Sequence, residues 1–198
     1  MIVARVERAT LVLGSAQSLG VIDAARLGAT SLRRRRGGGG VVLLQPSDLW
    51  VDWWIPHDDE RWSPDVHVSS RQVGSWWAAA LAPVVDAPLL VHEGALEGPS
   101  SFRVVCFAGR GPGEVFVNGR KIVGVTQWRV REGVFLSSVL RTGSTTDVLS
   151  FLTTVPEGLF EALDPEGFTT LHDTEATIIT RLREVAGPFE QRTARLAN

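Results

Sequence analysis

The chain has 198 residues, of which 44% are hydrophobic and 21% are charged, and its formal net charge is −2 at pH 7. This length predicts one domain spanning residues 1–198, and the near-zero charge gives no general attraction to nucleic acid or to an anionic membrane. A single cysteine excludes an internal disulfide, no apolar stretch approaches the roughly 18 residues that cross a bilayer, and the N-terminus lacks signal-peptide features, so we expect a cytoplasmic protein.

The first quarter of the chain is predicted to contain three strands and one helix. Residues 9–14 are typical of a strand, and residues 16–27 carry apolar side chains near helical spacing until Gly28 ends the pattern. Two apolar runs follow, at residues 41–44 and 49–55, with a Pro-Ser-Asp turn between them. These runs predict a β-hairpin.

The remainder begins with a predicted helix and continues as strands. Residues 63–83 start with Ser-Pro, carry apolar residues at helical spacing and end at a proline, which predicts a helix. Residues 86–101, rich in Pro, Gly and Glu, are expected to form a mobile loop over the sheet. From residue 145 the chain is predicted to be helical, with a cap at Asp173. Four strand-like runs lie between these parts, at residues 102–107, 114–117, 121–131 and 134–140.

This order of elements is typical of an α+β fold. It predicts a mixed, mostly antiparallel sheet with flanking helices, because strands that follow one another directly pair as antiparallel neighbours. A Glu-Gly turn joins the last two strand-like runs, so the second half is expected to contain an antiparallel meander. We expect no second domain.

Residues 33–40 place four arginines and four glycines ahead of an apolar run. Consecutive glycines leave backbone N–H groups free to turn inward as an anion-binding nest, and adjacent arginines can bind phosphate or carboxylate oxygens as a fork. The block therefore predicts a cradle for a nucleotide or an acyl carboxylate. The alternative interpretation is a solvated basic loop of low complexity.

Lys121 is the single lysine of the chain, and every other residue among the 20 Lys and Arg is arginine. A lysine ammonium is a compact point charge on a flexible stem, which suits an acyl or phosphoryl oxygen in a pocket. The alternative is a surface residue without a ligand. Cys106, the lone cysteine, is more commonly a small buried hydrophobe than a nucleophile.

The block at residues 33–40, called the glycine block below, and the lysine motif at residues 119–124 together resemble the biotin/lipoate A/B protein ligase family, the catalytic domain shared by lipoate–protein ligases, octanoyltransferases and biotin–protein ligases. The resemblance rests on Arg-Arg-x-x-Gly-Gly-Gly-x-Val followed later by Gly-Arg-Lys-Ile-x-Gly, covers about residues 11–140, and is closest to the lipoate–protein ligases. It implies that Lys121 contacts the activated acyl carbonyl and phosphate. The residues that it implies for the acyl and adenylate pocket are Arg33, Arg34, Gly37, Gly38, Gly39 and Gly124.

The resemblance also implies a reaction. A lipoyl or octanoyl group would be attached through an acyl adenylate, formed with ATP and Mg, to a lysine of a lipoyl carrier domain from a 2-oxoacid dehydrogenase or glycine cleavage complex. The physical reasoning agrees, because a lysine ammonium and backbone N–H donors offset the like charges of a carboxylate and a triphosphate. The four histidines show no ligand spacing, so no protein-bound metal site is predicted.

Three positions depart from the lipoate–protein ligase pattern and keep alternatives open. A Ser or Thr usually precedes the three glycines and a His-Asp pair commonly follows the valine, whereas this chain has Arg36, Leu43 and Leu44. These positions favour a non-catalytic member that binds lipoate or its carrier.

The second alternative is an octanoyltransferase that uses Cys106 as a thioester nucleophile and acyl carrier protein as donor. It rests on a Cys-Phe pair upstream of the lysine and a Gly-x-x-Gln-x-Arg run after it. Many complete ligases also carry a small C-terminal accessory domain, which we do not expect in this chain. A separate accessory subunit would then be a partner.

Overall fold

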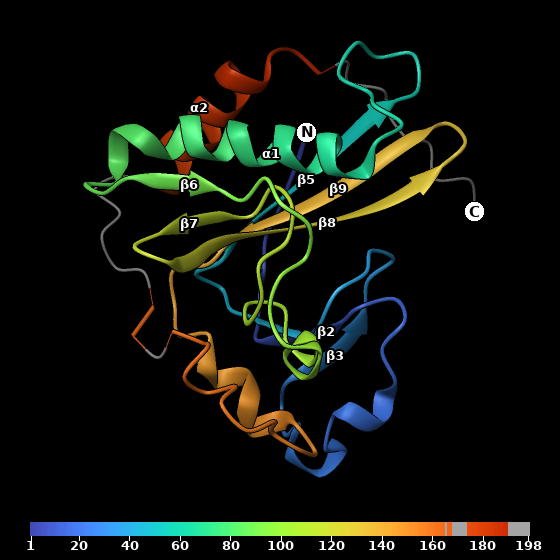
Figure 1. The fold of residues 1–198 in the computed structure, drawn as a ribbon, viewed down its shortest axis with the longest axis vertical. Helices are drawn as coiled ribbons and strands as arrows, with labels where there is room; N and C mark the ends of the chain where they lie inside the picture. Colours follow the sequence, from blue (N-terminus) through green and yellow to red (C-terminus); the bar gives the residue numbers. More distant parts are fainter. Residues whose placement is uncertain (165, 168–173, 190–198) are drawn as a thin grey trace.

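The computed structural model describes residues 1–164, 166–167 and 174–189, and it contains two β-sheets that face each other (Figure 1). The larger sheet has six strands and the smaller has three. In spatial order the larger sheet comprises β1 (Ile2–Ala4), β5 (Leu49–Pro56), β9 (Gly133–Leu140), β8 (Arg120–Val130), β7 (Val115–Val117) and β6 (Leu89–Val91). The smaller sheet comprises β3 (Ser31–Arg34), β2 (Thr10–Leu13) and β4 (Val42–Leu44).

The larger sheet is antiparallel, and its centre is the predicted meander. The turn between β8 and β9 pairs Val130 with Gly133, and the two strands then run together as far as Val123 opposite Leu140. The smaller sheet is mixed, since β2 pairs parallel with β3 and antiparallel with β4. The prediction of a mixed, mostly antiparallel architecture with flanking helices is confirmed.

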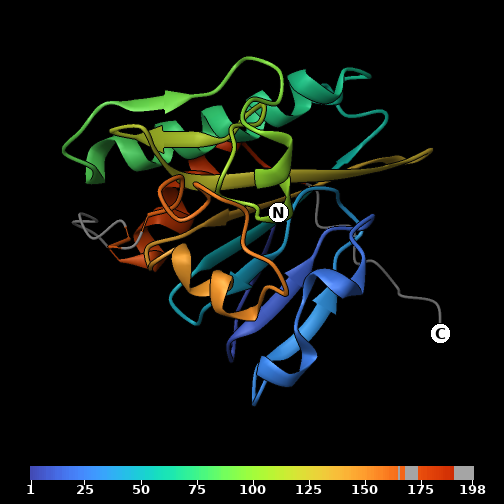
Figure 2. The ribbon, with the colours of Figure 1, turned by 60° about the horizontal axis from the view of Figure 1, so that its bottom comes forward.

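Two helices cover one face of the larger sheet, and the smaller sheet lies on the opposite side (Figure 2). Helix α1 (Val66–Leu81) begins where the Asp65 carboxylate accepts the His67 N–H at 2.7 Å, and it buries Trp77 against the sheet. Helix α2 (Glu175–Ala186) packs beside α1 and begins after Thr174. The predicted cap at Asp173 lies outside the described residues. Among the described residues, no helix is long and apolar enough to cross a membrane.

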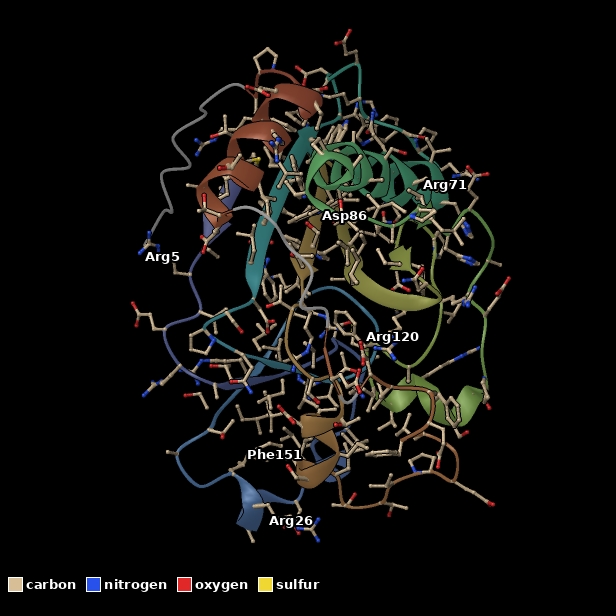
Figure 3. The ribbon with its side chains drawn as sticks, turned by 90° about the vertical axis from the view of Figure 1, so that its left-hand side faces the viewer. Arg5, Arg26, Arg71, Asp86, Arg120 and Phe151 are labelled. Carbon is tan, nitrogen blue, oxygen red and sulfur yellow. The ribbon has the colours of Figure 1, made fainter. Side chains whose placement is uncertain are left out.

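The predicted helix at residues 16–27 is wrong. This segment forms two short 3₁₀ turns, η1 (Leu19–Val21) and η2 (Ala24–Arg26). The Ser18 hydroxyl accepts the Gly20 N–H and the Asp23 carboxylate accepts the Ala25 N–H, each at 3.1 Å. Side chains that bond the backbone so locally compete with a continuous helix. In Figure 3, Arg26 lies next to Phe151, the last residue of η5 (Thr146–Phe151), at the end of the molecule opposite α1.

The predicted hairpin between residues 41–44 and 49–55 is also wrong, because β4 and β5 belong to different sheets. β4 is buried along its whole length, and a strand covered on both faces does not reveal its partner by alternation. The turn after β4 instead carries the chain from the smaller sheet to the larger one.

The segment between β6 and β7 runs from the larger sheet to the smaller one (Figure 1). The predicted strand at residues 102–107 is wrong, because η4 (Ser100–Val104) is a 3₁₀ turn and Val105 forms a single parallel bridge to Val41. The expected loop at residues 86–101 is wrong in part, since it contains the edge strand β6. The Val41 N–H donates to the Val104 carbonyl at 2.8 Å and ties the segment to β4.

Candidate active site

A cavity of about 730 Å³ lies beside β8. Its walls come from residues 38–40 of the glycine block, the first turn of α1, the segment from Ala95 to Pro112, and β8. Lys121 and Cys106 both line it. The fold therefore brings two chemically active side chains and part of the glycine block to one space, although they lie far apart in the sequence. A cavity of this size accommodates a small-molecule ligand.

Lys121 is the second residue of β8, and its side chain is only 3% exposed. Its Nζ lies 2.6 Å from Glu114 Oε2 and donates to the Cys106 carbonyl at 2.9 Å. An ammonium has three N–H donors. Two of them have fixed acceptors among the described residues, which leaves one for a ligand in the cavity.

Glu114 supplies the charge that balances Lys121. It lies immediately before β7, and its Oε2 also accepts the Gly111 N–H at 2.6 Å. Burial raises the pKa of Glu114, and the Lys121 ammonium, the Gly111 N–H and the charge of His92 offset part of that effect. The carboxylate thus fixes both the lysine and the turn in front of β7.

Sequence reasoning missed Glu114, although a signal for it was present. Asn118 and Gly119 both have positive φ, of 50° and 79°, as the tight turn of a two-residue hairpin requires. That turn pairs Phe116 with Lys121 across β7 and β8. An Asn-Gly pair just before the lone lysine therefore places the residues around 114–116 beside it.

The glycine block packs against β8. A Cβ on Gly37 would lie 2.5 Å from Thr126 Oγ1, and the Thr126 hydroxyl donates to the Gly38 carbonyl at 3.0 Å. The Arg36 guanidinium lies 4.5 Å from the centre of the Trp128 ring, a cation–π contact. A side chain at position 37 would therefore displace the loop from the strand.

The backbone of the glycine block has donors to offer. Among the described residues, none of the N–H groups of residues 37–40 donates to a protein acceptor. Two of the carbonyls are occupied instead, because the Arg35 guanidinium donates to those of Gly38 and Gly40, each at 2.8 Å. Free N–H groups in such a loop favour an anion.

The structure separates the remaining predicted pocket residues from the large cavity. Arg34 donates to three backbone carbonyls, the shortest at 2.6 Å to Gln17, and Arg33 donates to the Leu32 carbonyl. Neither arginine lines the cavity. Gly37 lines a hollow of about 220 Å³ next to Trp128. Of the predicted binding residues, Gly38 and Gly39 therefore lie at the cavity with Lys121.

Cys106 and Gly124 meet at a narrow apolar slot of about 20 Å³. Cys106 lines both this slot and the large cavity, and its backbone N–H donates to the Val41 carbonyl at 2.9 Å. A Cβ on Gly124 would lie 3.4 Å from the Phe107 ring, so a larger residue would narrow the slot.

The positions that depart from the family pattern have structural roles here. Leu43 and Leu44 are buried in the core around the smaller sheet, where a His-Asp pair would lack solvation. Arg36 stacks on Trp128, as described above. These three residues hold the glycine block and β4 in place.

No protein-family model matches the sequence, and neither does any curated protein. Solved structures do match. The bi-partite lipoate protein ligase of Thermoplasma acidophilum is 15% identical with a TM-score of 0.66, and the match covers 90% of this chain and 66% of that one. A lipoate-protein ligase A bound with ATP is 16% identical with a TM-score of 0.67, covering 90% and 67%.

A third match is LipL1 of P. falciparum in complex with lipoate, which is 12% identical with a TM-score of 0.61 and covers 93% of this chain and 45% of that one. This chain thus spans about two thirds of the length of the first two proteins and less than half of the third. At these identities the likeness establishes architecture, not chemistry. The protein has the fold of the lipoate–protein ligases, the fold that its glycine block and lysine motif predict.

Proposed function

We propose that the protein is a lipoate–protein ligase-like acyltransferase, which attaches a lipoyl or octanoyl group to a lysine of a lipoyl carrier domain through an acyl adenylate. One observation carries the proposal: the single lysine of the chain lines the same 730 Å³ cavity as the glycine block. The similar lipoate-protein ligase A is bound with ATP and LipL1 is in complex with lipoate, which supports the same substrates here.

In the first half-reaction an oxygen of the acyl carboxylate forms a bond to the α-phosphorus of ATP, and pyrophosphate leaves. Both reactants are anions, so the step requires positive charge at the reacting atoms. The remaining Lys121 donor and the free N–H groups of residues 38–40 supply that charge at the cavity. Gly38 and Gly39 are the proposed contacts for the adenylate.

In the second half-reaction the neutral amine of the carrier lysine attacks the acyl carbonyl, an amide forms and AMP leaves. Lys121 holds the carbonyl oxygen as negative charge develops on it. The proposed partner is a lipoyl carrier domain of a 2-oxoacid dehydrogenase or glycine cleavage complex. One similar structure is described as a bi-partite ligase with its E2 lipoyl domain, which supports that partner and a separate accessory subunit.

Magnesium is proposed to enter with the nucleotide. Within residues 1–164, 166–167 and 174–189 there is no cluster of three or more His, Cys, Asp or Glu side chains able to hold a metal ion. Mg²⁺ is commonly held by substrate phosphates with only one or two carboxylates. The described residues therefore fit MgATP as a substrate.

A second candidate function uses Cys106, because this residue lines both the cavity and the slot behind it. Its Sγ would attack the thioester of an octanoylated acyl carrier protein and release the thiol of that protein. The lysine of the lipoyl carrier domain would then attack the new thioester and regenerate Cys106. This route needs no ATP. The third candidate is a binding protein without activity.

The test is the intact mass of an apo lipoyl carrier domain incubated with the purified protein, in parallel with lipoate plus MgATP and with octanoyl-loaded acyl carrier protein. A gain in mass only with lipoate and ATP supports the adenylate route. A gain only from the acyl carrier protein supports Cys106 as nucleophile, with a Cys106→Ser variant as its control. No gain in either arm, with and without a candidate accessory subunit, overturns both catalytic proposals.

A further inference from the structure

We propose that Glu114 is a positioning residue, which holds the Lys121 ammonium so that one N–H group is directed at the reacting carboxylate and phosphate. The inference rests on the proposed function and adds a residue that the family resemblance did not supply. It follows from two sets of contacts: those between Glu114 and Lys121, and those that anchor the turn in which Glu114 lies.

The contact with the lysine is short and buried. Glu114 Oε2 lies 2.6 Å from Lys121 Nζ, with the two side chains 8% and 3% exposed. The Cys106 carbonyl accepts a second N–H, so two acceptors from different segments fix the nitrogen. A donor held in place before the reaction requires no reorganisation as charge develops.

The other side of Glu114 is anchored to the rest of the fold. Its carbonyl accepts the His92 N–H at 2.9 Å, its carboxylate accepts the Gly111 N–H, and a Cβ on Gly113 would lie 2.0 Å from the Ser70 carbonyl of α1. The turn is thus clamped between β6 and α1. The pairing of β7 with β8 is also irregular between Val115 and Phe116, where a bulge bends the strand beside the lysine.

The negative charge of Glu114 predicts that its loss affects kcat and not the affinity for lipoate. A free acyl acid is an anion before reaction, so Glu114 repels it while Lys121 attracts it, and the pair contributes little to ground-state binding. The α-phosphate gains negative charge in the transition state of adenylate formation, and the acyl carbonyl gains it in the transition state of transfer, so a fixed donor is most effective at those points. We therefore expect Glu114→Gln to lower kcat without weakening the affinity for lipoate.

The single lysine permits a direct measurement. Protein grown with ¹³Cε-lysine carries one labelled side chain, so its one NMR signal reports Lys121 in every variant. The variants are Glu114→Gln, Glu114→Asp, which retains the charge on a shorter stem, and Asp48→Asn. Asp48→Asn is the matched control, because it removes the carboxylate of another buried ion pair, with Arg141.

Pyrophosphate release and lipoate binding are measured alongside the signal. We expect Glu114→Gln to shift the lysine signal and to lower kcat about 100-fold, as for a misplaced catalytic group, with a lipoate Kd no higher than that of the unmodified protein. The kcat of Glu114→Asp is expected to lie between those of Glu114→Gln and the unmodified protein. Asp48→Asn is expected to lower the melting temperature while leaving the lysine signal and the kcat of the folded protein unchanged.

The outcomes separate the two proposals. An unchanged lysine signal in Glu114→Gln, or a kcat within about threefold of the unmodified protein, overturns the positioning role, since a lost contact of this kind is expected to cost about 100-fold. A raised lipoate Kd with an unchanged kcat indicates a purely binding or structural role and also overturns it. If Glu114→Gln does not fold, Glu114→Asp is judged by the same criteria. If the unmodified protein releases no pyrophosphate, the proposed function fails, while the lysine signal still tests the positioning.

Discussion

Lys121 and Arg141 are both buried cations with a carboxylate partner, yet their donors are used differently. Arg141 lies 2.9 Å from Asp48 and also donates to the carbonyls of Leu43 and Ser144, and its side chain is 2% exposed. Lys121 lies 2.6 Å from Glu114 and donates to one carbonyl, and it lines a cavity. Arg141 is buried against protein acceptors, while Lys121 retains one N–H donor for a ligand in the cavity.

The difference explains why the single lysine occurs where it does. A guanidinium presents a planar set of five donors, which suits fixed carbonyls such as those of Leu43 in β4 and Ser144 in the loop after β9, which Arg141 joins. An ammonium reaches a single oxygen from a flexible stem. Arg141 therefore joins Asp48, beside β5 of the larger sheet, to Leu43 of the smaller sheet, whereas the Lys121–Glu114 pair lines the cavity.

The largest effect is expected from the structural pair. Asp48→Asn leaves the Arg141 charge buried without a partner, so it should lower the free energy of unfolding by about 3–5 kcal/mol. Denaturant unfolding followed by tryptophan fluorescence measures this, with Asp58→Asn as an exposed control expected to change stability by no more than about 0.5 kcal/mol. Equal stability of the two variants would show that the Asp48–Arg141 pair does not stabilise the fold.

The next effect concerns activity. Lys121→Arg keeps a positive charge but not the small ammonium, so we expect kcat for acyl transfer to fall by about 10²–10³-fold while the circular dichroism spectrum is retained. Exchanging the two neighbours, Arg120→Lys with Lys121→Arg, keeps the composition and moves the lysine to an exposed position that faces Asp164. Recovery of turnover in the exchanged variant would show that position 121 has no special role.

The Glu114 carboxylate also predicts how turnover responds to acid. Burial raises the pKa of Glu114 above its usual 4.5, with Lys121 and His92 as the charged groups that oppose the shift. As pH falls through that raised pKa, Glu114 takes up a proton and releases the lysine, so kcat should fall about tenfold per pH unit below it. The same limb should be missing from the pH–rate profile of Glu114→Gln. An identical profile in both proteins would assign the limb to another group.

The parts of the fold that the sequence predicted are those with a visible period. The meander around β8 and β9 alternates and has glycine turns, and α1 has apolar residues at helical spacing. The failures involve segments whose neighbours are distant in sequence. β4 is apolar throughout, so alternation does not reveal its sheet, and residues 16–27 are divided by local side-chain bonds.

The candidate site divides in the same way. Lys121 stands out because it is the single lysine of the chain. Gly38 and Gly39 stand out because they belong to a run of four glycines, so the sequence alone singles out all three residues. Arg33 and Arg34 look equally suited to an anion, but on β3 their side chains bind backbone carbonyls instead. Glu114 resembles any other carboxylate until the pairing of β7 with β8 is known.

The smallest effect tests how the glycine block is attached to β8. Gly37→Ala places a Cβ 2.5 Å from Thr126 Oγ1, the hydroxyl that bonds the Gly38 carbonyl, so either the Thr126 side chain rotates and loses that bond or the loop shifts away from β8. We expect a loss of about 1 kcal/mol in unfolding free energy, at the low end for overpacking because a threonine side chain can rotate.

Gly38→Ala is the matched control for Gly37→Ala, since a Cβ there meets nothing within 4 Å and points into open space. Its stability should change by no more than about 0.5 kcal/mol. Its affinity for the acyl adenylate should nevertheless fall, because Gly38 lines the cavity. If Gly37→Ala lowers stability and Gly38→Ala lowers only affinity, position 37 fixes the loop and position 38 faces the ligand. If the two variants behave alike, the glycine block is not seated on β8, and Lys121 alone would then have to define the site.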